Sequence, residues 1–354
     1  MMDAAPALLE PPAWAARLRA DPTPWLLETS TPAVRHVALR DLFGRPPGDP
    51  DVTGARSAAM AADPIATILA NQDQDGYWVK PGIGYGPKYL GTAWSIIFLD
   101  QLGADPGDPG VRRGCEYLLA NTQAANGGFA ASGSERDRKP RGSLVIHCLN
   151  GNLLRAMIGF GWLADERVQR AVEWEARAIT GEGFDDYYRS ATSGPGFACA
   201  ANDRLPCAWG AVKAMLALAR IPPEARSPVV ARAIEQGVEF LLSRDPATAD
   251  YPMPGRSVKP NGSWFRPGFP SGYVTDVLQN LEALCELGQG KDARLGRALE
   301  WLLAKQDALG RWKNEYSYHG KTWIDFEKQG QPSKWVTLRA CRVLKAVEHG
   351  QESS

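Results

Sequence analysis

Net charge, long apolar runs and cysteine are all scarce in this sequence of 354 residues. Lys plus Arg and Asp plus Glu are balanced at 40 each, so there is no basic excess to attract duplex nucleic acid or an anionic membrane. No stretch reaches the roughly 18 uninterrupted apolar residues that a membrane span needs. We therefore expect a soluble protein without nucleic-acid partners, while peripheral membrane contact stays open.

The first residues and the cysteines bear on the cellular compartment. Asp3 and Glu10 lie where a signal peptide needs a basic start followed by an apolar run, so we expect no secretion signal. The few cysteines are spread thinly over a long chain, which favours reduced thiols over a disulfide framework. They are Cys115, Cys148, Cys199, Cys207, Cys285 and Cys341. The default expectation is a cytoplasmic protein.

What the sequence does contain is a repeat rich in Gly and aromatic residues. An apolar helix end, a Gln and a Gly-led turn that closes on an aromatic residue recur at 72–78, 123–129 and 306–312. Weaker copies lie at 172–184 and 240–245. Repeated helix pairs that cannot bury themselves individually must stack on their neighbours.

Segments of a different character alternate with these copies, because small and apolar residues surround their whole circumference. A helix that is apolar on all sides is buried, so these segments are predicted inner helices and the Gln-bearing helices outer ones. About six pairs are expected, and the Gly-rich returns favour closure into a ring over an open solenoid. The predicted inner helices are 31–42, 88–102, 143–160, 205–218, 272–287 and 333–347.

The pattern Gln-x-x-Asp-Gly-x-Trp at 72–78 and its relatives resemble the prenyltransferase and squalene cyclase repeat. The resemblance covers about residues 30–347, which leaves 1–29 as an N-terminal extension and 348–354 as a tail. It implies an all-α fold, an α/α toroid of six helical hairpins with a central apolar cavity. Triterpene cyclases, class II diterpene cyclase domains and the β-subunit of protein prenyltransferases share that fold. In this family the repeated Gln and Trp tie a turn to a helix end, and we expect the same structural role here.

The resemblance implies two possible chemistries, and the first is acid-initiated cyclisation. A squalene-type cyclase protonates an alkene with an Asp-x-Asp-Asp motif, which this sequence lacks. Its nearest approximations are Asp185 with Asp186, and Asp276 near the start of the inner helix 272–287. Desolvation there would raise the pKa of Asp276 and favour proton donation. Helix capping and the helix dipole explain an Asp at this position equally directly.

The second chemistry is metal-dependent prenyl transfer. Cys148, Cys199 and Cys207 gather at the starts of two consecutive inner helices, with Cys148 and Cys207 about one repeat apart. Catalytic zinc takes three protein ligands and keeps a fourth position open. The three thiols would supply the ligands of a tentative zinc ion, with His147, His319 or water as the fourth.

The ligand triad of protein prenyltransferases does not transfer position by position. It consists of an Asp and a Cys two residues apart and a His on a later helix, whereas Asp203 and Cys207 are four apart and His147 precedes them. His147 also points about 100° away from Cys148 on a helix. Cysteines are common in cores, and this is the expected role of Cys115, Cys285 and Cys341.

Other candidates would line the same site. Lys321, Lys334 and Arg266 are candidates to bind a diphosphate or carboxylate, although lysines are also common on surfaces. Aromatic residues near the inner-helix starts suit an isoprenoid chain or a carbocation, and packing explains some of them equally well. They are Tyr89, Trp94, Trp209, Trp264, Trp323 and Trp335.

The sequence thus predicts a terpenoid-cyclase- or prenyltransferase-like enzyme that acts on an isoprenoid-type ligand in a central cavity. Its catalytic candidates are Asp276, Asp203 and His319. A metal-free cyclase that uses Asp276 and a non-catalytic ligand-binding or structural toroid are the alternatives. A partner subunit, which protein prenyltransferases have, is left open. The starts of the inner helices are expected to meet at one mouth, bringing together Tyr89, His147, Cys148, Cys207, Asp276 and Lys334.

Overall fold

A computed structural model describes residues 13–133, 139–183, 192–248, 251 and 261–349, and within these ranges the regular structure is almost entirely helical. The exceptions are two short antiparallel pairs of strands. One pairs β1 (Ser193–Gly194) with β2 (Ala198–Cys199), and the other pairs β3 (Trp312–Lys313) with β4 (Pro332–Ser333). No helix in the described part of the chain has the length and apolar character needed to cross a membrane.

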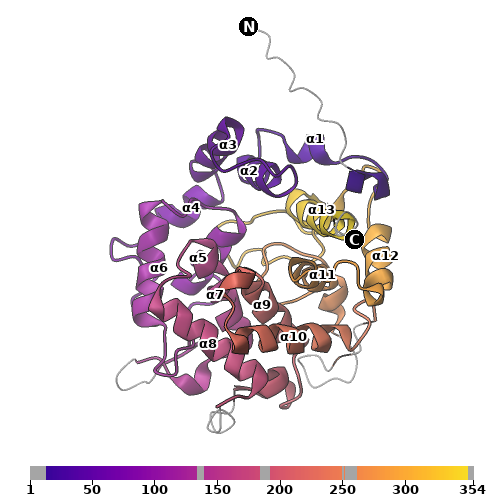
Figure 1. Ribbon diagram of the computed structural model, residues 1–354. Coiled ribbons are helices and arrows are strands. Elements are labelled where there is room, and N and C mark those ends of the chain that lie inside the picture. The colour runs from indigo at the N-terminus through magenta and orange to yellow at the C-terminus, as the bar shows by residue number, and fades with distance from the viewer. Residues whose placement is uncertain (1–12, 134–138, 184–191, 249–250, 252–260, 350–354) are drawn as a thin grey trace.

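Six helices form an inner ring, which Figure 1 shows end on. Consecutive inner helices contact one another from α5 to α13, and α13 also contacts α2. The ring closes at Gly103, just after α5, where an added Cβ would lie 2.8 Å from Val37 Cγ2 of α2. The inner helices are α2 (Pro32–Asp41), α5 (Thr92–Gln101), α7 (His147–Gly159), α9 (Ala208–Leu218), α11 (Val277–Glu286) and α13 (Lys334–His349).

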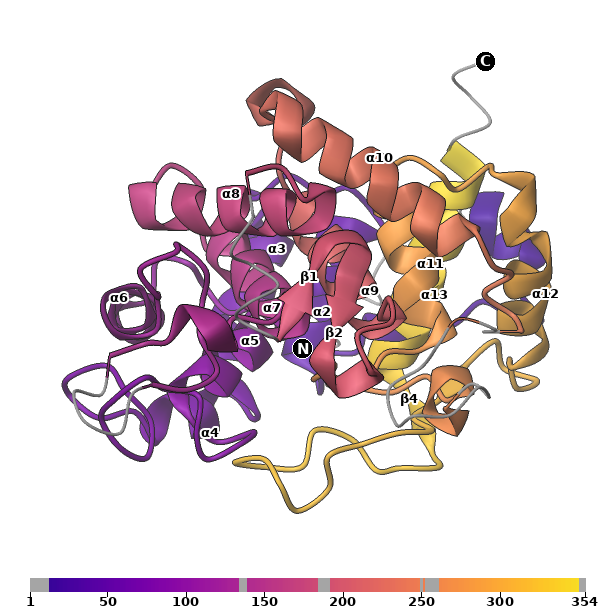
Figure 2. The same cartoon turned by 90° about the horizontal axis from the view of Figure 1, so that it is seen from below.

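A second layer of helices surrounds this ring (Figures 1 and 2). Residues 13–29, expected to be an extension, pack against α13, and Trp14 and Leu26 are buried. The two layers confirm the predicted all-α toroid with inner and outer rings. The outer elements are a 3-10 helix (Ala13–Arg17), α1 (Thr23–Leu26), α3 (Pro50–Met60), α4 (Ile65–Ala70), α6 (Pro109–Asn121), α8 (Glu166–Thr180), α10 (Pro228–Leu242) and α12 (Gly296–Ala304).

Two of the repeated Gln residues link an outer helix to the next one. Gln72 Nε2 donates to Gly76 O of its own turn at 3.2 Å and to Gly110 O of α6 at 2.9 Å. Gln123 makes the equivalent bonds, to its own turn at 2.7 Å and to Arg167 O of α8 at 2.6 Å. These contacts give the repeated Gln a structural role.

The third copy of the repeat connects the end of the chain to its beginning. Gln306 Oε1 accepts a hydrogen bond from Arg19 N at 3.0 Å, and Arg19 Nη1 donates to Gln306 O at 2.8 Å. Trp312 closes the same turn on its own helix by donating from Nε1 to Leu302 O at 2.8 Å. The last repeat therefore uses the N-terminal segment in place of a following outer helix.

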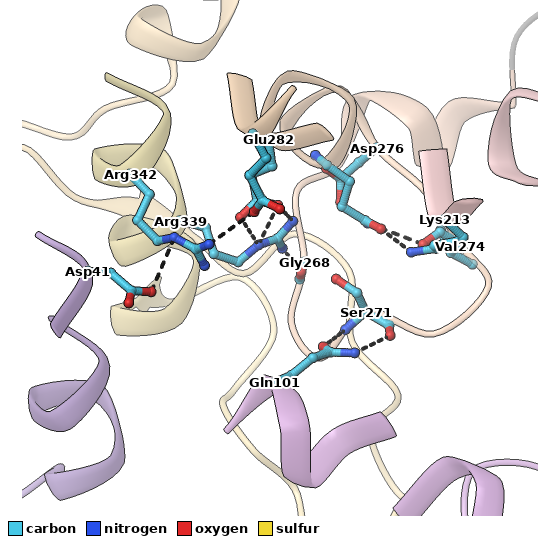
Figure 3. Close-up of polar contacts among 12 residues, drawn as sticks. Asp41, Gln101, Lys213, Gly268, Ser271, Val274, Asp276, Glu282, Arg339 and Arg342 are labelled. Carbon is cyan, nitrogen blue, oxygen red and sulfur yellow. Dashed lines mark hydrogen bonds and ion pairs between the residues drawn. The ribbon is translucent and has the colours of Figure 1, made fainter. Parts of the chain in front are cut away.

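The centre of the ring is occupied by the chain itself. Residues 267–272, which precede α11, are buried there. Gln101 of α5 holds the Ser271 backbone through two hydrogen bonds of 2.7 and 2.8 Å, and Arg339 of α13 donates to Gly268 O at 2.9 Å (Figure 3). These residues therefore occupy space in which the resemblance implies a central apolar cavity. Connecting segments normally run over the surface, so the sequence alone did not indicate this placement.

Candidate functional site

Two glycines bring the starts of α7 and α9 together. A Cβ on Gly151 of α7 would lie 2.6 Å from the Lys213 backbone of α9. A Cβ on Gly210 of α9 would lie 3.1 Å from His147 Cβ of α7. The helices therefore approach too closely for larger residues, and Cys148 in the first turn of α7 comes near Cys207, which precedes α9.

Cys199 and Cys207 flank a short closed loop. Cys199 N donates to Leu205 O at 3.2 Å, and Cys207 N donates to Phe197 O at 2.9 Å. The Cys207 thiol hydrogen-bonds the Cys199 sulfur, and Cys148 interacts electrostatically with both. We call Cys148, Cys199 and Cys207 the thiol cluster. The equivalent positions of Cys148 and Cys207 in the repeat account for this convergence.

The environment of the cluster favours one thiolate. The hydrogen bond from Cys207 lowers the pKa of Cys199 to about 6, against the opposing effect of burial. The Ala201 backbone N–H and the nearby His147 stabilise the same thiolate. The pKa of Cys207 is raised because its thiol donates to Cys199, and burial raises the pKa of Cys148 to about 12. These shifts favour a thiolate at Cys199 over one at Cys148 or Cys207.

His147 points away from the thiol cluster toward the outer layer. Its Nδ1 lies 2.7 Å from Glu175 Oε1 of α8, and its Nε2 lies 3.2 Å from Gly194 O. Burial lowers the pKa of His147, but the Glu175 carboxylate outweighs it and the net shift is upward. Both ring nitrogens face acceptors, which suits an imidazolium rather than a metal ligand.

The described residues contain no group of three or more His, Cys, Asp or Glu side chains arranged to hold a metal ion. The thiol cluster nevertheless has the donor chemistry that zinc prefers, since thiolates are its commonest structural ligands. A bound zinc would require the three sulfurs to converge on one centre. The residue types fit the metal, whereas their present spacing does not.

Five aromatic rings run side by side next to the cluster, and we call them the aromatic wall. Tyr318 lies 4.3 Å from Tyr89, Tyr89 lies 4.9 Å from Trp94, and Trp94 lies 5.0 Å from Tyr273, all between ring centres. Tyr85 stacks beside Tyr273 at 6.4 Å. Sequence analysis selected Tyr89 and Trp94 but missed the three tyrosines, because they belong to loops far apart in the sequence.

Lys88 connects the wall to the thiol cluster. Its ammonium nitrogen lies 5.2 Å from the ring centre of Tyr89 and 4.9 Å from that of Tyr273. Burial lowers the pKa of Lys88, and Cys148 acts in the opposite direction, which places that thiol within electrostatic range. Cys148 likewise raises the pKa of Tyr85 after the larger effect of burial. The wall therefore ends at Cys148, and we call this region, at the starts of α5, α7, α9 and α11, the mouth.

Asp276 lies behind the mouth and caps α11 (Figure 3). Its Oδ1 accepts from Gln279 N at 2.9 Å, and its Oδ2 accepts from Gln279 Nε2 at 2.8 Å. Burial raises the pKa of Asp276 and lowers that of the neighbouring Lys213 to about 7. Lys213 Nζ donates to Gln279 Oε1, so the amide links the two titratable groups.

Three other candidates lie apart from these groups. Lys334 Nζ donates to Glu28 Oε2 at 2.7 Å beside the N-terminal segment. His319 is 80% exposed and pairs with Asp325 at 2.5 Å. Asp203 is exposed, and its backbone adopts a left-handed conformation with a φ of 54°. Of the six residues expected to meet, Tyr89, Cys148, Cys207 and Asp276 contribute to the mouth or lie just behind it, His147 faces the outer layer and Lys334 lies elsewhere.

The tryptophans selected from the sequence have mostly packing contacts. Trp264 is fully buried and donates to Pro246 O at 2.8 Å. Trp335 stacks on Phe269, which lies inside the ring of helices, and the centroids of the two aromatic rings are 4.6 Å apart. Trp323 donates to Leu90 O at 3.1 Å and so holds the segment after β3 against α5.

Of the five candidates that remain, three lie among the described residues. Trp209 is half-buried, and its Nε1 has no hydrogen-bond partner. Lys321 is exposed but lies within electrostatic range of Lys88. Arg266 is exposed and donates to a backbone carbonyl at 2.7 Å. Asp185 and Asp186 lie outside the described residues.

No family model and no curated protein matches the sequence. Among solved structures, the chain is similar to the apo type II terpene cyclase MstE from Scytonema, with 14% identity, a TM-score of 0.28 and coverage of 84% of this chain and 98% of that chain. A protein from Actinoplanes is similar with 14% identity and a TM-score of 0.31, and the match covers 83% of this chain and 99% of that chain. A variant of MstE in complex with geranylgeranyl dihydroxybenzoate, its substrate, has 13% identity and a TM-score of 0.28, and the match covers 84% of this chain and 97% of that chain. Similarity this low assigns no chemistry, so the function must be argued from the residues of this chain.

Proposed function

We propose that the protein is a terpenoid-cyclase- or prenyltransferase-like enzyme that binds an isoprenoid-type ligand at the mouth. The apolar chain would lie along the aromatic wall, and its polar or reactive end would meet the thiol cluster. The observation that carries the proposal is a row of five aromatic rings near the starts of inner helices, two of which, Tyr85 and Tyr273, lie within electrostatic range of Cys148. An aromatic surface next to a few polar groups is typical of small-molecule sites.

The aromatic wall has the electrostatic character that a cationic intermediate needs. Aromatic faces attract positive charge, and Lys88 already places its ammonium over Tyr89 and Tyr273. Burial raises the pKa of Tyr89 to about 12, so its hydroxyl stays neutral and gives no competing ionised group. A ligand cation in place of the Lys88 ammonium would meet the same two rings.

The thiol cluster supplies the reactive end of the proposed site. The Cys199 thiolate is the deprotonated donor at neutral pH, and Cys207 supplies its hydrogen bond. We include in the proposal a zinc ion held by Cys148, Cys199 and Cys207, with the fourth position open. Bound zinc supplies Lewis acidity and keeps coordinated thiols deprotonated. His147 and Glu175 would then act behind the cluster by holding positive charge near Cys199.

Acid initiation by Asp276 receives less support from the geometry. Both of its carboxylate oxygens accept hydrogen bonds from Gln279, and the residue is 2% exposed. This arrangement is that of a helix cap. A ligand would have to displace the Gln279 side chain before the carboxyl group met an alkene.

A non-catalytic ligand-binding toroid is the second candidate, and the filled ring centre favours it. Residues 267–272 occupy the space in which an enclosed apolar chamber was expected. A ligand at the mouth would then lie against one end of the ring and stay closer to solvent. Such a protein would bind the isoprenoid ligand without converting it into a product.

Incubation with geranylgeraniol and with geranylgeranyl diphosphate in D2O separates these possibilities. Acid-initiated cyclisation leaves one solvent deuterium on carbon in the product, because a deuteron adds to the alkene and the final carbocation then loses a substrate proton or takes up water. Prenyl transfer to an added cysteine peptide breaks the C–O bond to diphosphate, forms a C–S bond and releases the thiol proton. Mass spectrometry and diphosphate release report the two reactions, and binding without either product supports the ligand-binding toroid.

The placement of the ligand is tested by Tyr89→Ala, with Trp162→Ala as a control. Trp162 lies outside the mouth, where Arg112 packs over its ring at 5.2 Å. We expect Tyr89→Ala to weaken geranylgeraniol binding about tenfold, since aromatic pairs and buried area are lost, and the control to bind normally. Absence of binding by the parent protein, or equal binding by both variants, would contradict the proposed site.

The metal is tested by elemental analysis of protein purified without chelators. We expect about one equivalent of zinc, as three ligand thiols imply, and its loss in Cys207→Ala. Cys341→Ala is the matched control, because Cys341 is a buried core thiol on α13. Metal-free parent protein together with a normally folded Cys207→Ala variant would rule out the zinc ion and leave the ligand site itself to the preceding tests.

A further inference from the structure

A cavity with charged walls opens at the opposite end of the ring from the mouth. It has a volume of about 540 Å3 and is lined by the ends of inner helices, including Asp41 of α2, Gly159 of α7 and Glu286 of α11. A smaller cavity of about 50 Å3 lies beside it and shares Arg220 and Glu282 in its lining. We call the two together the axial cavity.

Most charges around the axial cavity are paired. Arg339 contacts Glu282 at 2.5 Å, and Arg220 contacts Asp100 at 2.7 Å. Arg342 bridges to Glu286 at 3.0 Å, as well as to Asp41 (Figure 3). These pairs fix the walls, and their carboxylates are already neutralised.

Arg155 is different from the other guanidinium groups. It lines the inner part of the axial cavity, and its Nε is buried with no hydrogen-bond partner. Among the described residues, no carboxylate lies within ion-pair distance of it. Arg220 is a close positive neighbour, since it donates to Arg155 O at 2.7 Å.

The charged side chains around the axial cavity also leave an excess of positive charge. The lining has more cationic side chains than carboxylates, although the carbonyl groups at the helix ends offset part of this excess. A buried charge without a partner is costly, so such groups are normally paired or bind a ligand. The cationic groups are Arg40, Arg155, Arg220, Arg339, Arg342 and Lys345, and the carboxylates are Asp41, Asp100, Glu282 and Glu286.

We propose that the axial cavity binds an oxyanion, the phosphate or carboxylate group of a small molecule, with Arg155 as its central contact. A planar guanidinium offers two parallel donors to either group. Gln101 and Ser271 line the same inner cavity beside it. This site lies apart from the mouth and does not depend on the function proposed there.

Calorimetric titration of the full chain at constant ionic strength tests the site, with phosphate, diphosphate and succinate as separate probes. Saturable binding of a phosphate probe but not succinate, or the reverse, identifies the head group. We expect Arg155→Met to weaken that binding at least about tenfold, because a charge-assisted pair is lost. Arg297→Met is the control, since Arg297 is 69% exposed and pairs with Asp245 on the surface.

Thermal unfolding distinguishes a binding role from a packing role. Without ligand, Arg155→Met should unfold at the same temperature as the parent or higher, because the variant no longer holds a half-buried guanidinium without a carboxylate partner. With ligand, the parent should gain stability and the variant should not. Failure of all three probes to bind the parent, or equal affinity in Arg155→Met, would overturn the proposal. If Arg155→Met does not fold, Arg155→Lys gives the same comparison, with weakened binding expected from its loss of the paired donors.

Discussion

Among single residues, Cys199 has the most distinctive chemistry. Its sulfur accepts the Cys207 hydrogen bond and backbone N–H groups, and His147 lies near enough to stabilise its negative charge. Cys115 and Cys341 show the contrast, since burial in the core raises the pKa of both thiols. Thiolate character depends on local donors and charge, and these differ sharply within one chain.

In zinc-free protein, alkylation of Cys199 should therefore follow an unusually low pH profile. We expect its modification by iodoacetamide to rise with pH around a midpoint of about 6, since the thiolate forms above its pKa. Cys207→Ala removes the largest stabilising contact, so the midpoint should move up toward 9, the ordinary value. Peptide mass spectrometry measures the rate at each pH, with buried Cys115 as the unreactive internal control. A parent midpoint near 9, or one that Cys207→Ala leaves unchanged, would show that the cluster does not stabilise a thiolate.

At the scale of elements, the crossing of α7 and α9 determines the geometry of the mouth. Gly151 and Gly210 let the helices approach until Cys148 and Cys207 meet. The period of the repeat already indicates that these positions are equivalent on neighbouring helices. The period does not indicate how closely the two helices approach each other, because that distance depends on small residues at their crossing.

Gly151→Ala should disturb both packing and the thiol cluster. Its Cβ would lie 2.6 Å from the Lys213 backbone, so the helices must separate, at a cost of about 1–3 kcal/mol in the free energy of unfolding. The midpoint of Cys199 alkylation should also rise, because His147 of α7 would move away from the Cys199 thiolate that it stabilises. Denaturant unfolding and the alkylation profile measure the two effects.

Gly54→Ala is the matched control for this substitution. Gly54 lies inside α3, and an added Cβ there meets nothing within 4 Å. It should stabilise the protein by about 0.5–1 kcal/mol, because alanine favours the helix. Equal effects of the two substitutions would show that close approach of α7 and α9 is not required.

At the scale of the whole molecule, closure of the ring depends on both ends of the chain. Gln306 bonds the N-terminal Arg19, and α13 packs against α11 on one side and α2 on the other. Arg339 of α13 also neutralises the buried Glu282 of α11. The last helix pair is therefore a structural requirement for the pairs that precede it.

Removal of residues 292–347 should abolish cooperative folding rather than shorten the domain. The truncation opens the ring, exposes the apolar faces of α2 and α11, and leaves Glu282 without Arg339, a loss that by itself costs about 3–5 kcal/mol. Circular dichroism during thermal unfolding measures the transition. A soluble fragment with an undiminished transition would contradict a closed, interdependent ring.

The sequence by itself determined the repeat, the alternation of inner and outer helices and the all-α toroid, and it predicted that Cys148, Cys199 and Cys207 lie near one another. These features follow from local periodicity, which can be recognised in the sequence without knowledge of distant contacts. Only the tertiary structure decided that residues 267–272 fill the ring centre, that His147 faces Glu175, and that Tyr85, Tyr273 and Tyr318 complete the aromatic wall. Such contacts join loops distant in sequence, whose paths follow from packing and hydrogen-bond satisfaction across the whole ring rather than from any local pattern.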